Sequence, residues 1–170
     1  ALRADVPNGS YHLWLALANG EQRSQELDLG EVTVEGRPHS FALPPLAAAV
    51  DASFGSNVQL AGLQSVPAAD VRPGATLEVP LVWQVVEPST RPLVRFVHLL
   101  GVDGKPLAQH DSAPCEGECP ASSWIAGEVL TDTVTLTIPD GVTAGRYTLA
   151  TGWYDGETLE RLEVRDVQGK

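Results

Sequence analysis

The feature that most constrains the fold is the alternation of apolar and polar residues in short runs, which clusters of Gly, Pro, Asn and Asp separate. In residues 76–86, Leu77, Val79 and Leu81 begin an apolar row along one face. Side chains on a strand alternate between two faces, so this pattern predicts β-strands. Pro80 has no N–H to donate, which predicts that this strand lies at an edge or carries a bulge.

The same pattern predicts most of the remaining strands. They cover residues 11–18, 27–35, 57–66, 93–100, 132–138, 146–154 and 159–164. Residues 46–50 are the one candidate for a helical turn, and so short a run after two prolines is predicted to be a connector. Strands at this spacing without helices between them predict an all-β fold, an antiparallel two-sheet sandwich of immunoglobulin-like or jelly-roll-like type. A closed barrel is the structural alternative.

An internal repeat divides the chain. The sequence VPNGSYHL at residues 6–13 recurs as VTAGRYTL at residues 142–149, an offset of 136 (142 minus 6). The repeat predicts that residues 1–45 are the closing strands of a preceding repeat and that residues 46–170 form the sandwich. The repeat also predicts that residues 11–35 form a β-hairpin equivalent to one over residues 147–164, and the first hairpin would have one strongly apolar face. We expect that face to pack on the main sandwich or on a second chain, as in a homodimer.

Charge and hydropathy exclude several partners. With 22 acidic and 11 basic residues, the net charge of −11 repels phosphate backbones, so nucleic acid is not an expected partner. No run reaches the roughly 18 apolar residues of a membrane span. We expect contact with a membrane only through parts of a parent chain that lie outside this sequence.

The two cysteines predict a local disulfide. Cys115 and Cys119 lie four positions apart in a segment that contains glycine and proline, and a bridge there indicates an oxidising compartment. Zinc would need two more soft ligands, and the nearest histidine, His110, stands alone. No metal and no cofactor is therefore predicted. The alternative that stays open is a calcium site made of loop carboxylates: Asp111, Glu116, Glu118 and Asp132.

An ordered set of motifs resembles a known family. These are FG at 54–55, VQLAG at 58–62, RPGATL at 72–77, FVHLL at 96–100, QHD at 109–111 and GWYD at 152–155. They resemble the β domain that follows the membrane spans of large bacterial membrane glycosyltransferases, similar to the dolichyl-phosphate-mannose protein mannosyltransferase and aminoarabinose transferase group. This resemblance implies an extracytoplasmic location within a membrane-anchored protein. The family's catalytic carboxylates belong to the membrane portion, so the resemblance supplies no catalytic residue here.

The chain departs from that family's pattern in one loop. Ala121 stands where the family has threonine, and the two cysteines are not part of the family's pattern. The loop over residues 111–124 is therefore expected to be locally remodelled.

The candidate catalytic residues fit structural roles better than chemical ones. The sequence has no Gly-x-Ser-x-Gly elbow. Glycoside hydrolysis needs two carboxylates about 5–10 Å apart, and the candidates Asp111, Asp132 and Asp155 are typical of turns and strand ends. His98 is predicted to be buried and hydrogen-bonded, and the neighbours His110 and Asp111 to point to opposite faces of a strand. The chain is predicted not to be an enzyme.

Exposed aromatic residues are the candidates for sugar binding. Trp83, Tyr147 and Trp153 are assigned to the core. The candidate ligand-binding residues are Trp14, Trp124, Tyr154 and Asp111. The sequence therefore predicts a non-catalytic accessory sandwich for substrate engagement or domain spacing, with a glycan or polyprenyl-linked sugar as partner. A carbohydrate-binding module that stacks sugars on aromatic rings is the alternative, and a secreted hydrolase is the second alternative.

Overall fold

The computed structural model of the chain describes residues 4–19, 22–67 and 71–166. It divides into two compact units, residues 1–38 and 39–170. We call their described parts the N-terminal hairpin and the sandwich. The sequence pattern placed the boundary after residue 45, whereas Ser40 already belongs to the sandwich, since its carbonyl accepts a 2.7 Å hydrogen bond from the N–H of Val129.

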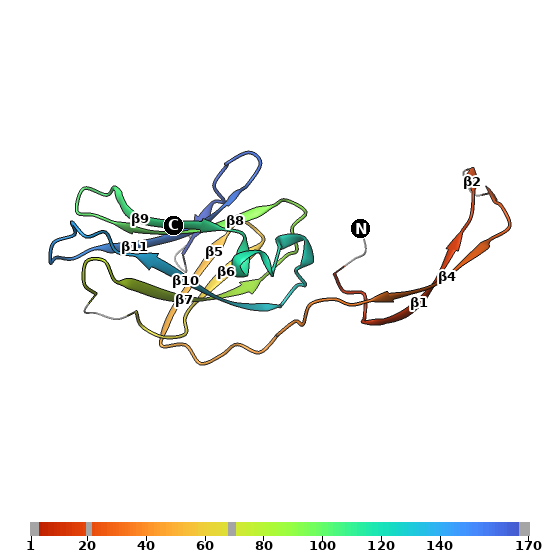
Figure 1. Ribbon diagram of the computed structural model, residues 1–170, viewed down its shortest axis with the longest axis horizontal. Coiled ribbons are helices and arrows are strands. Elements are labelled where there is room, and N and C mark those ends of the chain that lie inside the picture. The colour runs from red at the N-terminus through yellow and green to blue at the C-terminus, as the bar shows by residue number, and fades with distance from the viewer. Residues whose placement is uncertain (1–3, 20–21, 68–70, 167–170) are drawn as a thin grey trace. The chain divides into compact units, whose positions relative to one another are not determined.

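The described residues form an all-β structure, as predicted (Figure 1). The hairpin holds β1 (Gly9–Leu15), β2 (Ala18–Asn19), β3 (Gln22–Arg23) and β4 (Leu27–Val34). The sandwich holds β5 (Ala48–Phe54), β6 (Val58–Leu63), β7 (Thr76–Val85), β8 (Leu93–Leu100), β9 (Pro106–Ser112), β10 (Val129–Thr137), β11 (Thr148–Asp155) and β12 (Val164–Arg165). Two short 3-10 turns lie between β9 and β10: η1 (Pro114–Gly117) and η2 (Ala121–Ser123). Among the described residues, no helix has the length and apolar character needed to cross a membrane.

The sandwich consists of two antiparallel sheets. One has the strand order β10-β7-β6-β5-β12 and the other the order β11-β8-β9. Figure 1 shows them as two layers. The last two strands of the chain belong to different sheets, because β11 pairs with β8 while β12 pairs with β5.

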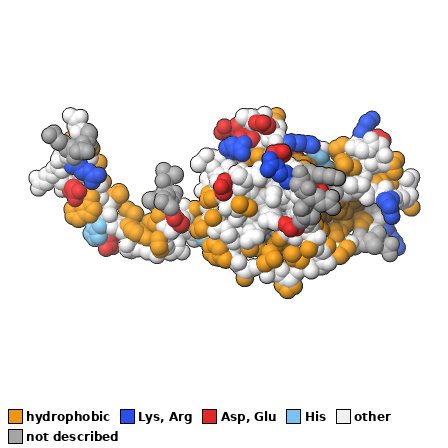
Figure 2. Space-filling view, turned by 180° about the vertical axis from the view of Figure 1, so that it is seen from behind, with side chains coloured by type: hydrophobic (Ala, Val, Ile, Leu, Met, Phe, Trp, Pro, Cys, Tyr) orange, Lys and Arg blue, Asp and Glu red, His pale blue; other side chains and the backbone are white. Residues whose placement is uncertain are grey.

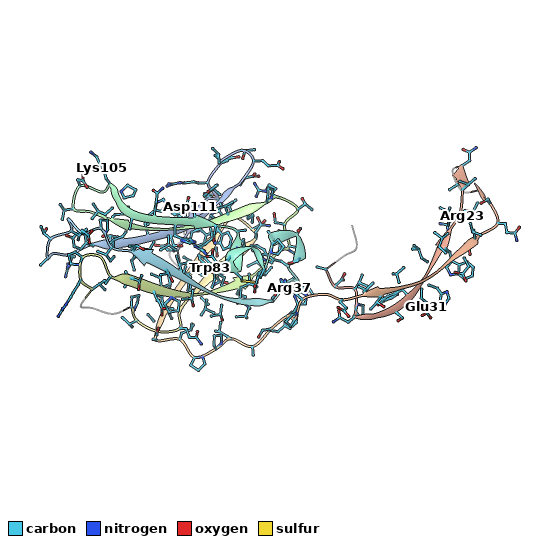
Figure 3. The ribbon with its side chains drawn as sticks, viewed as in Figure 1. Arg23, Glu31, Arg37, Trp83, Lys105 and Asp111 are labelled. Atoms are coloured by element: carbon cyan, nitrogen blue, oxygen red, sulfur yellow. A yellow bond between two sulfur atoms is a disulfide. The ribbon has the colours of Figure 1, made fainter. Side chains whose placement is uncertain are left out.

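Tryptophan side chains join the two layers. Trp83 on β7 and Trp153 on β11 pack edge to face, with ring centroids 5.0 Å apart, and Trp83 lies between the layers in Figure 3. Trp124 packs in the same way on Trp153 at 5.6 Å. Burying large aromatic rings contributes much of a core's stability, so this cluster holds the sheets together. The aliphatic part of the core includes Leu77, Val79, Leu81, Leu93, Val97, Leu99, Val134 and Leu136.

Two strands of the sandwich escaped the sequence analysis, and so did the two-residue β3 of the hairpin. Residues 46–50 are not a connector throughout, because β5 begins at Ala48 and pairs with β6. Alanine and aspartate have low strand propensity, and pairing with a neighbouring strand overrides it. A bulge lies between Ala49 and Ala52, where Asp51 has a φ of 57°. The strand β9 was missed for a related reason, since its sequence PLAQHDS has no β-branched residue.

The predicted edge position of Pro80 is wrong. Its strand, β7, is paired on both sides, with β10 and with β6. The ladder between β7 and β6 ends at the pair Leu81–Leu63, however, so Pro80 lies one residue beyond it. On β10, Pro80 stands opposite Thr133. A proline is tolerated within this central strand because the β6 side uses only its carbonyl, which accepts a 3.0 Å hydrogen bond from the N–H of Gln64.

The N-terminal hairpin is amphipathic. In the ladder between β1 and β4, Gly30 has a φ of 92° and lies at a bulge that keeps the alternation of β4 in phase with β1. One face carries His12 and Trp14 opposite Glu31 and Asp28. The other face is apolar, and its side chains are between 36% and 60% exposed: Tyr11, Leu13, Leu15, Leu27, Leu29 and Val32.

Candidate functional site

A polar cluster lies on the face of the three-stranded sheet that points away from the core. His98 on β8 and Asp111 on β9 are hydrogen-bonded, with Nε2 and Oδ1 2.9 Å apart. Tyr154 on β11 lies near the same carboxylate, because Asp111 is one of the causes that raise the pKa of its phenol. The alternation of β8 explains this orientation, because Val97 points into the core and its neighbour His98 therefore points outward. Figure 3 labels Asp111 on this sheet.

Phe96 and Arg161 complete this outer-face cluster. The Phe96 ring lies 4.8 Å from the ring of His98 and 6.4 Å from that of Tyr154. The guanidinium of Arg161 lies 4.8 Å from the Phe96 centroid, a cation–π distance. Aromatic packing on one side of each polar group restricts its rotamers. The hydrogen-bonding groups are therefore held in fixed positions on a rigid sheet.

The electrostatics of the cluster keep Tyr154 a proton donor. Partial burial raises the pKa of Tyr154 above its ordinary value of 10.0, and the negative charge of Asp111 together with their hydrogen bond raises it further. This face therefore presents the side chains of Tyr154, Asp111, His98 and Arg161 together. These groups match the alternating donors and acceptors of sugar hydroxyls.

The structure brings together two of the four predicted ligand-binding residues, Asp111 and Tyr154. Trp14 lies on the polar face of the N-terminal hairpin, where its ring is exposed and stacks beside His12. Trp124 is only 1% exposed, and its indole N–H donates to the carbonyl of Cys119 at 2.9 Å. A ring buried in this way presents no face to a ligand. Trp124 was a candidate because the sequence places it in a loop, but this loop folds over the core and buries the ring.

Sequence reasoning missed three members of the cluster. His98 was predicted to be a buried, hydrogen-bonded residue. Its bond to Asp111 agrees with that reading, but its side chain lies on the outer sheet face. Phe96 and Arg161 were not singled out, because nothing in the local pattern places a residue at 161 over one at 96. The predicted opposition of His110 and Asp111 is confirmed, since His110 contacts Glu116, whereas Asp111 contacts His98.

The predicted disulfide between Cys115 and Cys119 is present, with their Cα atoms 5.4 Å apart. Cys115 and Glu116 both have left-handed backbones, with φ values of 50° and 53°. Such conformations are unfavourable for non-glycine residues, so the bridge and its neighbours must hold them. One neighbour is Arg95, whose Nη2 lies 3.4 Å from the Glu116 carboxylate. The bridge therefore shapes the loop above Arg95.

Beneath this loop an ion pair joins the two sheets. Arg95 on β8 is 0% exposed and Asp132 on β10 is 2% exposed. The guanidinium donates twice to the carboxylate, at 2.8 and 3.3 Å. A bidentate pair buried in this way is a structural element, because loss of Arg95 would leave the buried carboxylate of Asp132 uncompensated.

The remaining carboxylate candidates are likewise engaged. Asp155 is buried and accepts hydrogen bonds from the N–H groups of Glu157 and Thr158, so it holds the turn after β11. The four residues considered for calcium do not converge, because Asp111 faces outward and Asp132 lies in the core. In the part of the chain that the structure describes, no group of three or more His, Cys, Asp or Glu residues is arranged to hold a metal ion.

A separate cavity of about 570 Å³ lies between the ends of the two sheets. Its described lining is largely apolar and includes Leu77, Leu99, Ile138, Tyr147 and Leu149, and Arg72 also lines it. The sequence does not predict this cavity, because inward-facing apolar residues on strands give the same alternation whether they fill a core or line a cavity. Its chemistry suits an apolar group.

Comparisons with known proteins add no relative to this picture. The resemblance to the β domain of membrane glycosyltransferases rests on the sequence motifs alone. No family model, no curated protein and no solved structure matches the chain.

Proposed function

We propose that the sandwich is a non-catalytic accessory module of a cell-envelope glycosyltransferase-like protein, and that it engages the sugar part of a substrate. The observation that carries the proposal is the outer-face cluster of Tyr154, Asp111 and His98. Sugar recognition on a β-sheet needs planar polar groups and aromatic surface fixed on a rigid support, and this cluster offers both.

The non-catalytic part of the proposal rests on how the carboxylates are used. Asp132 is bonded to Arg95 and Asp155 to backbone N–H groups, and both are buried. Of the three candidates, only Asp111 stands on the outer face, and a glycosidase needs two carboxylates across a cleft. Binding is therefore better supported than turnover.

The extracytoplasmic location has two supports. A disulfide joins Cys115 and Cys119, and such bridges persist in oxidising compartments. The sequence motifs resemble a module that lies outside the cytoplasmic membrane. On this proposal the substrate is a glycan, either free or linked to a polyprenyl carrier.

The test is a glycan array probed with the whole chain, with Tyr154→Phe, Asp111→Asn and Thr148→Ala alongside. Thr148 is exposed at the other end of β11, so Thr148→Ala is the matched control. We expect binding to fall about tenfold or more in the two cluster variants, which corresponds to the loss of a charge-assisted hydrogen bond. Thr148→Ala should bind like the wild type. Circular dichroism confirms that each variant is folded.

Two results would overturn the proposal. Silence across neutral and acidic glycans, in free form and as polyprenyl-linked sugars, would leave domain spacing as the role. Hydrolysis of any glycan by the chain, abolished in Asp111→Asn, would make the protein an enzyme. If free glycans bind with the same affinity as polyprenyl-linked sugars, the result would favour a general carbohydrate-binding module over an accessory module that is specific for a carrier-linked substrate.

A further inference from the structure

The repeat in the sequence is matched by a repeated hydrogen bond. The hydroxyl of Tyr11 donates to the carbonyl of Pro7 at 2.8 Å, and the hydroxyl of Tyr147 donates to the carbonyl of Thr143. Each acceptor lies four residues upstream of its tyrosine. A tyrosine that bonds back to the preceding corner is a recognised feature of Greek-key sandwiches, where it introduces one of the last strands. The N-terminal hairpin thus begins in the same way as the end of the sandwich.

The second copy shows what such a strand does in a complete sandwich. After Tyr147, β11 pairs with β8 along its whole length, and its inward residue Trp153 is 1% exposed. The chain then crosses to the other sheet, where β12 pairs with β5. One closing strand is thereby added to each sheet.

The hairpin carries leucines at the positions that correspond to the core-facing positions of β11, and these leucines are exposed. At the offset of 136 (147 minus 11), Leu13, Leu15 and Leu17 answer to the inward positions 149, 151 and 153 of β11. These leucines are between 49% and 74% exposed. Figure 2 shows hydrophobic side chains at the surface of the segment that carries β1 and β4. Two strands supply only one layer, so nothing within the hairpin can bury this face.

A strand equivalent to β8 is the partner that the pattern requires, and neither the sandwich nor a second copy of this chain offers one. In the sandwich, β8 is paired with β11 on one side and with β9 on the other. A β1 strand that takes up the position of β11 therefore needs a sandwich body whose own closing strands are absent.

We propose that residues 4–38 are the closing strands of a preceding sandwich of the same kind. The apolar face formed by Tyr11, Leu13, Leu15, Leu27, Leu29 and Val32 docks on that sandwich's interior. The strand β1 then pairs with the counterpart of β8. The protein is thus a tandem array in which this chain holds one complete sandwich and the end of another. This inference is independent of the proposed sugar site.

The test compares amide hydrogen exchange in the parent protein with exchange in the 1–170 chain. We expect the amides of β1 to exchange about 100-fold more slowly in the parent protein, because docking removes local opening. In the parent, Leu15→Asp should abolish this protection. Trp14→Ser, its neighbour on the polar face, should preserve it. Exchange in β8 serves as the internal reference and should be the same in all forms.

Three outcomes would overturn the inference. One is a parent gene with no strand-rich segment of sandwich length before residue 1. Another is slow exchange of β1 in the 1–170 chain as a monomer, which would mean that the face is covered by the chain itself. The third is slow exchange that appears only as the 1–170 chain dimerises, which sedimentation velocity detects and which would make a second copy the partner.

Discussion

The two ends of the chain carry the same sequence pattern in different surroundings. Tyr11 and Tyr147 both bond the carbonyl four residues before them; Tyr11 lies within β1, and Tyr147 directly precedes β11. At the C-terminal end that strand joins β8, and its inward residue Trp153 is buried. At the N-terminal end it pairs only with β4, and its apolar face is exposed. Local sequence therefore determines the corner and the strand, whereas the available neighbours determine which ladder forms.

The two ends of the chain are not equivalent in the way that the sequence pattern predicts. The sequence predicted that Tyr147–Val164 would form a hairpin like that of residues 11–35. In the sandwich, however, β11 meets the following segment only at an isolated bridge between Tyr154 and Arg161. The predicted strand over residues 159–164 is absent, because Leu159 has a φ of 61° and the strand proper is Val164–Arg165. In the sandwich, β11 pairs with β8 and β12 pairs with β5, in different sheets. In the hairpin, β1 and β4 pair with each other.

The largest expected contrast is between Trp153 and its counterpart Leu17. Trp153→Ala should lower the free energy of unfolding of the sandwich by about 3–5 kcal/mol, since it removes a buried ring that packs on two others. Leu17→Ala should leave it within about 0.5 kcal/mol, because Leu17 is exposed. Urea denaturation followed by far-UV circular dichroism measures both. Equal losses of stability in the two variants would contradict the contrast between the buried and the exposed end of the chain.

A second contrast concerns Gly152, whose counterpart in the hairpin is Ala16. A Cβ on Gly152 would lie 2.6 Å from the Phe96 ring, too close for a real contact. Gly152→Ala should therefore cost about 1–3 kcal/mol of sandwich stability, and Ala16→Gly should leave sandwich stability unchanged. The same urea titrations test this. An unchanged midpoint for Gly152→Ala would mean that the Phe96 ring is free to move aside.

A third contrast concerns the two tyrosine corners. Tyr147→Phe removes one hydrogen bond to the Thr143 carbonyl and should cost the sandwich about 0.5–1.5 kcal/mol. Tyr11→Phe removes the equivalent bond in the hairpin and should leave sandwich stability unaltered. Thermal unfolding by calorimetry resolves the difference. A destabilisation by Tyr11→Phe as large as that by Tyr147→Phe would show that the two units unfold together.

The smallest effect concerns pH and the outer-face cluster. The pKa of Tyr154 is raised in the folded state, so its contribution to stability is fully present below pH 10.0 and is lost as the pH rises through the higher folded-state pKa. Tyr154→Phe should make this alkaline loss shallower. Urea midpoints at pH values from about 9 upward, spaced about one unit apart, provide the measurement. Parallel curves for the variant and the wild type would contradict the assignment.

Much of the fold was predictable from alternation, because a half-buried strand needs little more than its two faces. The strands β7, β8 and β10 follow directly from rows such as Val134 and Leu136. The strands β5 and β9 were not predictable, because their residues carry no local preference and pair only once neighbours exist. The central position of Pro80 depends on where the adjacent strand β6 ends, which local sequence does not encode.

The candidate site was half predictable. Asp111 and Tyr154 were identified as polar and aromatic residues outside the expected core, and they do meet. Trp124 was also identified as a residue outside the predicted core, but its ring is buried, because a tryptophan in a loop can fold back over the sheets. The meeting of His98 with Asp111 depends on the register between β8 and β9, and a register set by distant residues cannot be read from either strand alone.

Amide exchange in the 1–170 chain tests the central contrast most directly, because it reports on β1 and β11 in one sample. We predict that the β11 amides that bond to β8 exchange only through global unfolding. The β1 amides that bond to β4 should exchange about 100-fold faster or more, through local opening of the hairpin. Sedimentation in the same buffer establishes whether the chain is a monomer. Exchange of β1 as slow as that of β11 in a monomer would contradict the account.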